Sequence, residues 1–571
     1  CPLRHRQSIQ RCQSLAERRA AINASIAWYY SQITDLKSPL NPVNRLHDEV
    51  LTRIFHEVAF MDGQPARLPW VQAMHVCRRW HRLLLADQIL WGHIRLQVSS
   101  YRPRRDRLQN QLRLSGGAPL FLQVESFYEG RLTWVRELLP GHAGRLRELV
   151  FKAPLLHSLE VIEALGAHAL PLMRRLHVDA MQSGVDEDAT KAMIPMTFFD
   201  GRAPALTDLD LRKMDVDWSF LHGLTRLHLS DLTDQPFCAL LSVLVACPAM
   251  VTLHLDVHFV HVAEDLSVVH LPRLEYMWLR EHASTCARVL QSIAIPPTAR
   301  LQLLSGGILG GADFPELLME IRRHTRSSSA PQLRTLSLQS MGDPRQYLMI
   351  TLYTQLELPE IFQNDHCQLS INSHPPNELA ACQIVNRLLS AVPAENIVLL
   401  DARMAATIQP RTWVTVLGQL PNLESIASFA DAAAAHLCGA IRLLAARTIS
   451  RVPSTLRRLQ ITVRRNSERE RLDGEIRAAV NALKAMLAEL HARGRPLREL
   501  QIDEPQGAAF PLSRAEWEEL CGMVGTLIRD GRSWDALAEK RKLGRLVAER
   551  DQFMAELDRE IAAGDFEDDS L

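Results

Sequence analysis

The chain has 571 residues, 47% of them apolar, and its 65 Lys and Arg residues balance its 65 Asp and Glu residues. This length predicts several domains or one long repeat array, and the balanced charge argues against a nucleic-acid partner and against an anionic membrane. The ten cysteines are scattered and form no C-x-x-C pair. This argues against a disulfide scaffold or a zinc module and predicts reduced thiols in the cytoplasm or the nucleus.

The beginning of the chain and its apolar runs bear on secretion and on membrane insertion. The chain begins at Cys1 rather than Met, so we expect a fragment or an incomplete gene prediction. Arginines interrupt any apolar region near the start, which argues against a signal peptide. The longest apolar runs, such as residues 237–247, are too short to span a bilayer.

Residues 1–40 are predicted to form an amphipathic helix. Its apolar side chains follow a 7-4-3-4-3 spacing close to a coiled-coil seam, at Leu15, Ile22, Ile26, Tyr29, Ile33 and Leu36. Pro39 and Pro42 then end the helix. Because the seam is short, we expect this helix to pack on the next domain or to pair weakly with another chain.

Residues 41–96 are predicted to form a small helical domain. Spacings of three to four residues predict a first helix with one apolar stripe, formed by Leu46, Val50, Leu51, Ile54, Phe55 and Val58. A second helix, predicted over about residues 70–85, has two apolar faces, formed by Ala73, Val76, Trp80 and Leu83 and by Trp70, Met74, Cys77 and Leu84. So small a domain cannot bury both faces by itself, which predicts that one face binds a partner.

Three blocks occur in order in this stretch: Leu46-x-x-Glu49-x-Leu51-x-x-Ile54-Phe55, Val76-Cys77-Arg78-Arg79-Trp80 and Leu90-Trp91-x-x-Ile94. Together they resemble an F-box, in the form found in large F-box-like proteins of mushroom-forming (basidiomycete) fungi. The resemblance implies a three-helix motif that docks on the adaptor protein of a cullin–RING ubiquitin ligase of the SCF type. An ordinary helical core is the alternative interpretation.

The resemblance also implies which residues bind the adaptor, namely Leu46, Leu51, Ile54, Phe55, Val76, Cys77, Trp80, Leu90 and Trp91. Leu46, Ile54 and Phe55 are expected to present apolar surface, whereas Trp80 and Trp91 are expected to hold the bundle together. The family usually has Pro where this chain has His47. Pro would start the helix rigidly, so Asn44 or Asp48 is expected to cap it instead.

Residues 97–145 are predicted to be a connector. Its basic cluster at residues 101–107 (YRPRRDR) is interpreted as a solvated linker, with a nuclear localisation signal or an anion site as the alternative. Residues 112–124 (LRLSGGAPLFLQV) predict the end of a helix, a Gly-Gly turn and a strand.

Residues 146–505 are predicted to form an irregular leucine-rich-repeat domain. A block of the form L-x-x-L-x-L recurs with aliphatic or aromatic substitutes, at Leu146/Leu149/Phe151, Met173/Leu176/Val178, Leu206/Leu209/Leu211, Leu224/Leu227/Leu229, Met250/Leu253/Leu255, Leu274/Met277/Leu279, Leu333/Leu336/Leu338, Leu456/Leu459/Ile461 and Leu497/Leu500/Ile502. The first six blocks start at residues 146, 173, 206, 224, 250 and 274, which lie 18 to 33 residues apart. This is roughly the leucine-rich-repeat period.

A second regularity supports the repeats. A proline stands two residues before the first apolar residue of five blocks, at Pro204, Pro248, Pro272, Pro331 and Pro421. Each unit therefore reads as helix, Pro and strand, and such units must stack to bury their core. Between residues 338 and 456 the pattern fades to weak candidates at Ile397/Leu399 and Leu423/Ile426. Leucine-rich α/β packing without a solenoid is the alternative.

Residues 506–571 are predicted to form a helical cap and an acidic tail. Helices are predicted over residues 517–528 and 534–563, after an amphipathic helix over residues 470–493 that precedes the last strand. A coiled-coil partner site is the alternative to a cap. The tail over residues 565–571 is expected to be disordered.

No catalytic motif is found, so we predict that the chain is not an enzyme and holds no metal or cofactor. Gly306-Gly307 and Gly310-Gly311 lack the Lys and Ser/Thr of a phosphate loop. The histidines at positions 254, 258, 261 and 270 lack cysteines or carboxylates at a fixed spacing. His254 is expected to point outward between inward-facing leucines.

We therefore predict an α/β chain with an N-terminal helix, a three-helix F-box, an irregular leucine-rich-repeat solenoid and C-terminal helices. The implied function is that of a substrate-recognition subunit of an SCF-type ubiquitin ligase, with the adaptor and an unknown protein substrate as partners. The alternatives are a leucine-rich interaction scaffold with a weak or vestigial F-box, and an uncharacterised enzyme. No nucleic acid and no membrane is expected as a partner.

Overall fold

The computed structural model describes residues 42–61, 69–98, 105–126, 132–181, 202–260, 268–305, 314–341, 347–358, 367–375, 378–405, 408–446, 455–463, 469–503, 512–530 and 532–533, with Asn23, Ser25, Ile194, Arg550 and Gln552. Nearly all of the predicted helices at residues 1–40 and 534–563, the acidic tail, the two Gly-Gly pairs after residue 305 and His261 lie outside these residues. The chain divides into unit 1 (residues 1–188 and 197–205) and unit 2 (residues 189–196 and 206–571), which are described separately.

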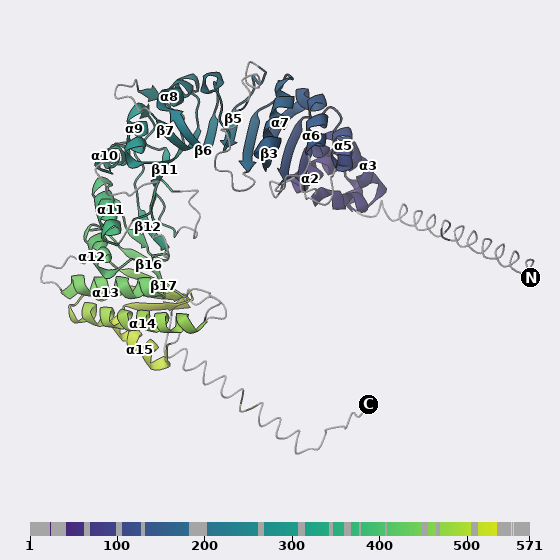
Figure 1. Cartoon of the computed structure of the whole chain (residues 1–571). Helices are drawn as coiled ribbons and strands as arrows, with labels where there is room; N and C mark the ends of the chain where they lie inside the picture. Colours follow the sequence, from purple (N-terminus) through teal and green to yellow (C-terminus); the bar gives the residue numbers. More distant parts are fainter. Residues whose placement is uncertain are drawn as a thin grey trace, which may run out of the picture. The chain divides into compact units, whose positions relative to one another are not determined.

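Unit 1 begins with short helices and continues into a parallel sheet (Figure 1). Its elements are η2 (Pro42–Arg45), α2 (Asp48–Phe60), η4 (Pro69–His75), α3 (Arg78–Ala86), α4 (Gln88–Trp91), β1 (His93–Val98), α5 (Arg105–Leu114), β2 (Leu120–Ser126), α6 (Thr133–Leu138), η5 (Pro140–Arg145), β3 (Leu146–Pro154), α7 (Leu155–Gly166) and β4 (Arg175–Met181). The strands pair in chain order from β1 to β4. The sheet therefore begins at His93, earlier than the repeat blocks indicated.

The connector contains the helix end, turn and strand that its sequence predicted. Helix α5 ends at Leu114, and Gly116 adopts a positive φ of 48°, which costs glycine little because it has no Cβ. Strand β2 follows and pairs with β1 on one side and β3 on the other. Gly92 between α4 and β1 is required for a different reason, because a Cβ there would lie 2.5 Å from the Pro119 carbonyl oxygen.

Unit 2 repeats strand and helix along most of its length. Its elements are β5 (Asp208–Arg212), η7 (Trp218–Phe220), β6 (Arg226–Pro236), α8 (Phe237–Ala246), β7 (Thr252–Val260), β8 (Val269–His270), β9 (Tyr276–Glu281), α9 (Ala283–Ser292), β10 (Ile293–Ala294), β11 (Arg300–Ser305), α10 (Phe314–Thr325), β12 (Thr335–Met341), β13 (Tyr347–Tyr353), β14 (Leu369–Ser373), α11 (Glu378–Ala391), η8 (Ala394–Asn396), β15 (Leu399–Asp401), α12 (Pro410–Gly418), β16 (Ser425–Phe429), α13 (Ala432–Ala446), β17 (Arg458–Thr462), α14 (Arg469–Ala492), β18 (Glu499–Asp503), α15 (Arg514–Met523), β19 (Thr526–Arg529) and β20 (Arg532–Ser533). Helices α8 to α14 follow one face of its sheet (Figure 1).

The strands β3 and β4 of unit 1 and seven strands of unit 2 carry the full repeat blocks as predicted. In every full block the last two apolar residues lie within a strand, and their side chains are buried. Pro248, Pro331 and Pro421 each lie between the end of a helix and the start of the next strand. The weak candidates at Ile397/Leu399 and Leu423/Ile426 correspond to β15 and β16. The alternating polar residues face away from the helices, and we call this face of the sheet the open face.

The order of the strands changes where the sequence pattern fades. Strands β5, β6, β7, β9 and β11 are parallel neighbours in that order, but β11 next pairs with β14 rather than with β12. The order continues through β13 and β12 to β15, and β13 is antiparallel to both of its neighbours. From β15 to β19 the parallel order resumes. A three-stranded meander of β12, β13 and β14 thus interrupts the repeat, and β15 and β16, which follow it in the parallel order, carry only the weak candidates.

The predicted helix over residues 517–528 is wrong in its second half. Helix α15 ends at Met523, and residues Thr526–Arg529 form β19, which pairs in parallel with β18. Gly525 permits this approach, since a Cβ at that position would lie 2.8 Å from the Arg498 carbonyl oxygen. The predicted helix over residues 470–493 is confirmed as α14.

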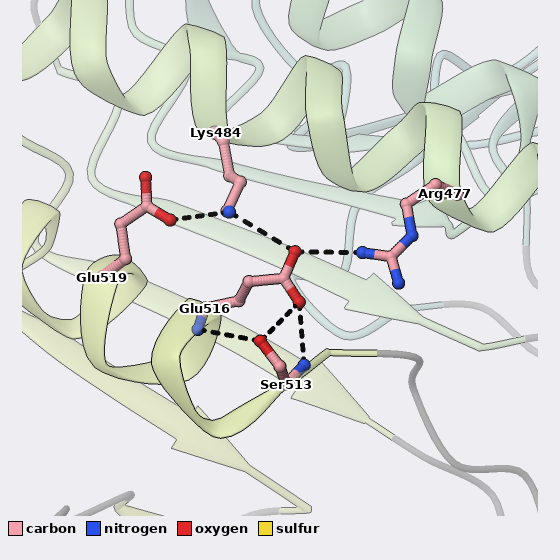
Figure 2. Close-up of polar contacts among 5 residues, drawn as sticks. All are labelled: Arg477, Lys484, Ser513, Glu516 and Glu519. Atoms are coloured by element: carbon pink, nitrogen blue, oxygen red, sulfur yellow. Dashed lines mark hydrogen bonds and ion pairs between the residues drawn. The ribbon is translucent and has the colours of Figure 1, made fainter.

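Helix α15 is joined to α14 by a network around Glu516 (Figure 2). One carboxylate oxygen of Glu516 accepts hydrogen bonds from Arg477 (2.9 Å) and Lys484 (3.4 Å), and the other accepts from the Ser513 backbone N–H (2.8 Å) and hydroxyl group (2.9 Å). Lys484 also contacts Glu519 at 2.6 Å. The bonds from Ser513, followed by the charge of Lys484, lower the pKa of Glu516 from 4.5 to about 2.

We predict that Glu516→Gln loosens α15 from α14. The substitution removes the charge that holds Arg477 and Lys484, so hydrogen exchange of the α15 amides is expected to become severalfold faster than in the wild type. Because the pKa of Glu516 is lowered, its contribution is complete above about pH 4.5 and is lost as the pH falls toward 2. Glu518→Gln, which removes an exposed pair with Arg514 within the same helix, is the matched control and should change exchange little. Equal exchange in both variants would contradict the role of the network.

Candidate functional site

Helix α2 carries two apolar stripes, and only one of them is buried. Leu51, Phe55 and Ala59 face the interior, where they pack with Trp70, Leu84, Leu90 and Trp91. The other stripe consists of Val50, Ile54, Val58 and Met61, whose side chains are 45%, 41%, 44% and 80% exposed. We call these four residues the outer stripe. Their spacing of four, four and three residues places them along one side of the helix.

The residues implied by the resemblance separate into a buried and an accessible group. Leu51, Phe55, Leu90 and Trp91 belong to the core, and Leu46, Cys77 and Trp80 are half-buried. Ile54 and Val76 are exposed. The expectation that Phe55 presents surface is therefore corrected, since its ring packs edge-on against Trp80 with 5.1 Å between centroids. Val50, Val58 and Met61 have the same exposed character but were not among the implied residues.

The predicted second helix over residues 70–85 is interrupted in its middle. Residues Pro69–His75 form the 3-10 helix η4, and Cys77 is fully extended (φ −158°, ψ 166°) before α3 begins. This break turns Val76 outward, where it is 60% exposed. Trp70 on η4 and Trp91 on α4 pack edge to face with 4.9 Å between ring centroids.

The start of α2 is held by a residue of α3. His47 occupies the N-cap position without a side-chain hydrogen bond, so Asp48 does not cap the helix as expected. Instead, the Asp48 carboxylate accepts a hydrogen bond from Arg79 Nε at 2.8 Å. Arg79 also donates a hydrogen bond to the Leu46 carbonyl oxygen. At the other end of the bundle, Asp87 caps α4 and contacts His56 of α2 at 2.6 Å. These polar contacts fix the direction of α2 without covering the outer stripe.

A second candidate surface lies on the open face of unit 2. Asp210, His228, His254 and Trp278 occupy matching positions on β5, β6, β7 and β9. Their side chains form a continuous row, which we call the aromatic ladder. The ring centroids of His228 and His254 are 3.6 Å apart, and those of His254 and Trp278 are 3.8 Å apart and nearly parallel. His254 therefore points to the open face, as predicted.

Ion pairs flank the ladder on both sides. Arg226 pairs with Asp208 at 3.4 Å, and Arg280 pairs with Asp256 at 3.1 Å. Desolvation and the neighbouring His228 together lower the pKa of His254 from 6.5 to about 3, although Asp210 acts in the opposite direction. The ladder thus combines stacked rings with the Asp210 carboxylate and lies within a polar surface, a combination that suits recognition of a protein segment by stacking and hydrogen bonding.

In the meander formed by β12, β13 and β14, the polar side chains of this face are buried. Ser337 and Thr351 are completely buried, and the Ser337 hydroxyl group donates to Asp401 at 3.1 Å. Arg403 Nε donates to the same carboxylate at 2.9 Å. We assign this polar cluster a structural role, because its hydrogen-bonding groups satisfy one another.

Three of the four histidines that lie close together in the sequence, His254, His258 and His270, belong to the described residues and have different surroundings. His254 belongs to the ladder, and His270 is exposed on β8. His258, at the end of β7, lies instead beside Glu281 and His282, which are more than twenty residues later in the chain. The spacing of residues in the sequence does not predict that Glu281 and His282 lie beside His258. The pairing of β7 with β9 would have indicated it. Of the helices in the described ranges, none has the length and apolar character required to cross a bilayer.

Comparison with known proteins identifies no family for this chain. No family model matches it, and no curated protein matches it. Among solved structures it is similar to the leucine-rich repeat-containing protein LegL7 from Legionella pneumophila, with 12% sequence identity over 78% of this chain and 92% of that chain. The TM-score is 0.23, so this likeness supports no conclusion about the chain.

We predict that His254 makes the stability of unit 2 depend on pH. Below about pH 6.5 the unfolded chain takes up a proton at His254, whereas the folded chain does so only near pH 3. Acidification from pH 6.5 toward 4 should therefore lower the free energy of unfolding, and His254→Phe should reduce this slope by up to about 1.4 kcal/mol per pH unit. Chemical denaturation at several pH values measures the slope. Identical slopes in the wild type and the variant would contradict the environment described for His254.

Proposed function

We propose that the chain is a substrate-recognition subunit of an SCF-type cullin–RING ubiquitin ligase. In this proposal the helical region over residues 42–91 docks on the adaptor, and the open face of unit 2 binds a protein substrate. The observation that carries the proposal is the outer stripe of α2, an apolar helix surface left exposed beside a core that is already complete. The three-block resemblance supplies the identity of the partner.

The exposed apolar side chains are concentrated in the helical region. Of the sixteen large hydrophobic side chains that are exposed among the described residues, eight lie between residues 43 and 89, namely Val43, Val50, Ile54, Val58, Phe60, Met61, Val76 and Ile89. A concentration of this kind is typical of a surface that another protein covers. Scattered single residues would need no such explanation.

Arg79 supports the proposal at the position where the chain departs from the family pattern. His47 cannot fix the backbone as Pro would. The contacts of Arg79 with the Leu46 carbonyl oxygen and the Asp48 carboxylate hold the same turn from the side of α3. We infer that α2 keeps a defined orientation toward the adaptor despite His47.

The proposed mechanism requires no catalytic residue in this chain. A receptor of this class works by proximity, since holding a substrate near the conjugating enzyme raises its effective concentration. The aromatic ladder is the part of the open face that we propose contacts the substrate. Its rigid rings and flanking ion pairs offer both contact area and hydrogen-bonding groups.

A leucine-rich interaction scaffold without a ligase role is the second candidate function. His47 and the absence of a side-chain cap on α2 favour it. In that case the open face would still bind a protein, but the outer stripe would not bind the ligase adaptor.

We predict that a double substitution in the outer stripe, Ile54→Glu and Val58→Glu, abolishes co-purification with the ligase adaptor. Both side chains are about half exposed, so each stands to lose roughly 1 kcal/mol of apolar burial, and two buried charges add to that cost. We expect the dissociation constant to rise at least about tenfold. Leu156→Glu, at a 66% exposed position of α7, is the matched control. Phe55 is unsuitable for this test because its substitution would damage the core.

Thermal unfolding of each variant separates the interpretations. Adaptor binding that is lost in the folded double variant and retained in Leu156→Glu supports the ligase role. A folded wild-type chain that forms no complex with the adaptor would favour the scaffold instead.

A further inference from the structure

A cluster of possible metal ligands lies at the carboxyl ends of the neighbouring strands β7 and β9. It consists of His258, Glu281 and His282. His258 lies near the end of β7, Glu281 is the last residue of β9, and His282 is the N-cap of α9. Their nitrogen and oxygen donor atoms all lie within 4.8 Å of one another. The cluster is separate from the aromatic ladder and from the outer stripe, and neither proposed binding surface uses it.

Strand register brings these residues together. The pairing of β7 with β9 ends at Asp256 and Arg280. His258 lies two residues farther along β7, and His282 lies two residues beyond Arg280, directly after the end of β9. The adjacent ends of the two strands thus bring the two imidazoles together. The ring centroids are 6.1 Å apart and the rings are steeply inclined to each other, at 74°.

The carboxylate of Glu281 is positioned by the backbone. One of its oxygens accepts from His258 Nδ1 at 2.8 Å and from the Phe259 N–H at 3.3 Å, and the other accepts from the His282 N–H at 2.8 Å. The side chain is only 11% exposed. Among the described residues it forms no ion pair with Lys or Arg, whereas nearby Asp256 pairs with Arg280. The carboxylate is thus fixed in place beside two imidazoles, with no Lys or Arg in its ion pairs to compete for its charge.

We propose that His258, Glu281 and His282 bind one divalent transition-metal ion, with Zn²⁺ as the best match. Two imidazoles and one carboxylate form a ligand set that suits Zn²⁺ and leaves an open position for water. A single carboxylate is too few hard ligands for Ca²⁺ or Mg²⁺. The ion would link the ends of β7 and β9 to the start of α9, and so fasten two neighbouring repeats.

Little rearrangement is required to close the site. Bonds of about 2.0–2.1 Å to a tetrahedral ion bring donor atoms to about 3.4 Å from one another. The two histidines are exposed, so their rings can rotate, while the backbone N–H groups keep Glu281 in place. His258 would give up its hydrogen bond to Glu281, carry its proton on Nε2 and coordinate through Nδ1.

The site can be tested by titrating the metal-free full-length chain with Zn²⁺ against a chromogenic chelator. We expect one equivalent to bind with a micromolar or lower dissociation constant, and His258→Gln or His282→Gln to weaken this binding at least tenfold. His222→Gln, at an exposed histidine outside the cluster, is the matched control and should leave it unchanged. Circular dichroism in the presence of a chelator checks that the variants are folded, and Co²⁺ absorption reports nitrogen and oxygen ligation at the same site.

Two results would overturn the proposal. One is a wild-type chain that shows no saturable binding of a single equivalent of Zn²⁺. The other is such binding that persists undiminished in the folded His258→Gln/His282→Gln double variant, which would place the ion elsewhere. Neither outcome depends on binding of the ligase adaptor, so the metal site and the proposed function succeed or fail separately.

Discussion

Burial of one face of a parallel sheet is the constraint on which the rest of the structure depends. Each strand contributes apolar side chains that only a helix and the neighbouring strands can cover, so no repeat is stable alone. The same register that aligns these side chains also aligns the polar residues between them. The row from Asp210 to Trp278 and the approach of His258 to His282 are therefore direct consequences of core packing.

Much of the array could be predicted because an L-x-x-L-x-L block reports local burial. The meander could not, because β13 (YLMITLY) has no alternation of apolar and polar residues, and six of its seven residues are buried. Neither could the partners of His258, which depend on strands far apart in the sequence. In the helical region, Ile54 and Phe55 are adjacent apolar residues in one broad stripe. Only packing against Trp80 decides that Phe55 is buried and Ile54 is exposed.

The two candidate surfaces differ in chemistry, and this difference suits two kinds of partner. The outer stripe is aliphatic and lies on a short helix, as expected for a constant partner that covers it permanently. The open face combines stacked rings with ion pairs, which favours selectivity over burial. The proposed function joins one fixed partner to one selected partner, and it requires both types of surface.

Oxidative footprinting of methionines in the presence and absence of the ligase adaptor tests the central claim most directly. Met61 in the outer stripe is 80% exposed, and Met319 on α10 is 60% exposed and serves as an internal reference. Docking of the adaptor on the outer stripe predicts that hydroxyl radicals oxidise Met61 severalfold more slowly in the mixture, while the rate at Met319 stays the same. An unchanged rate at Met61 under saturating adaptor would contradict the account.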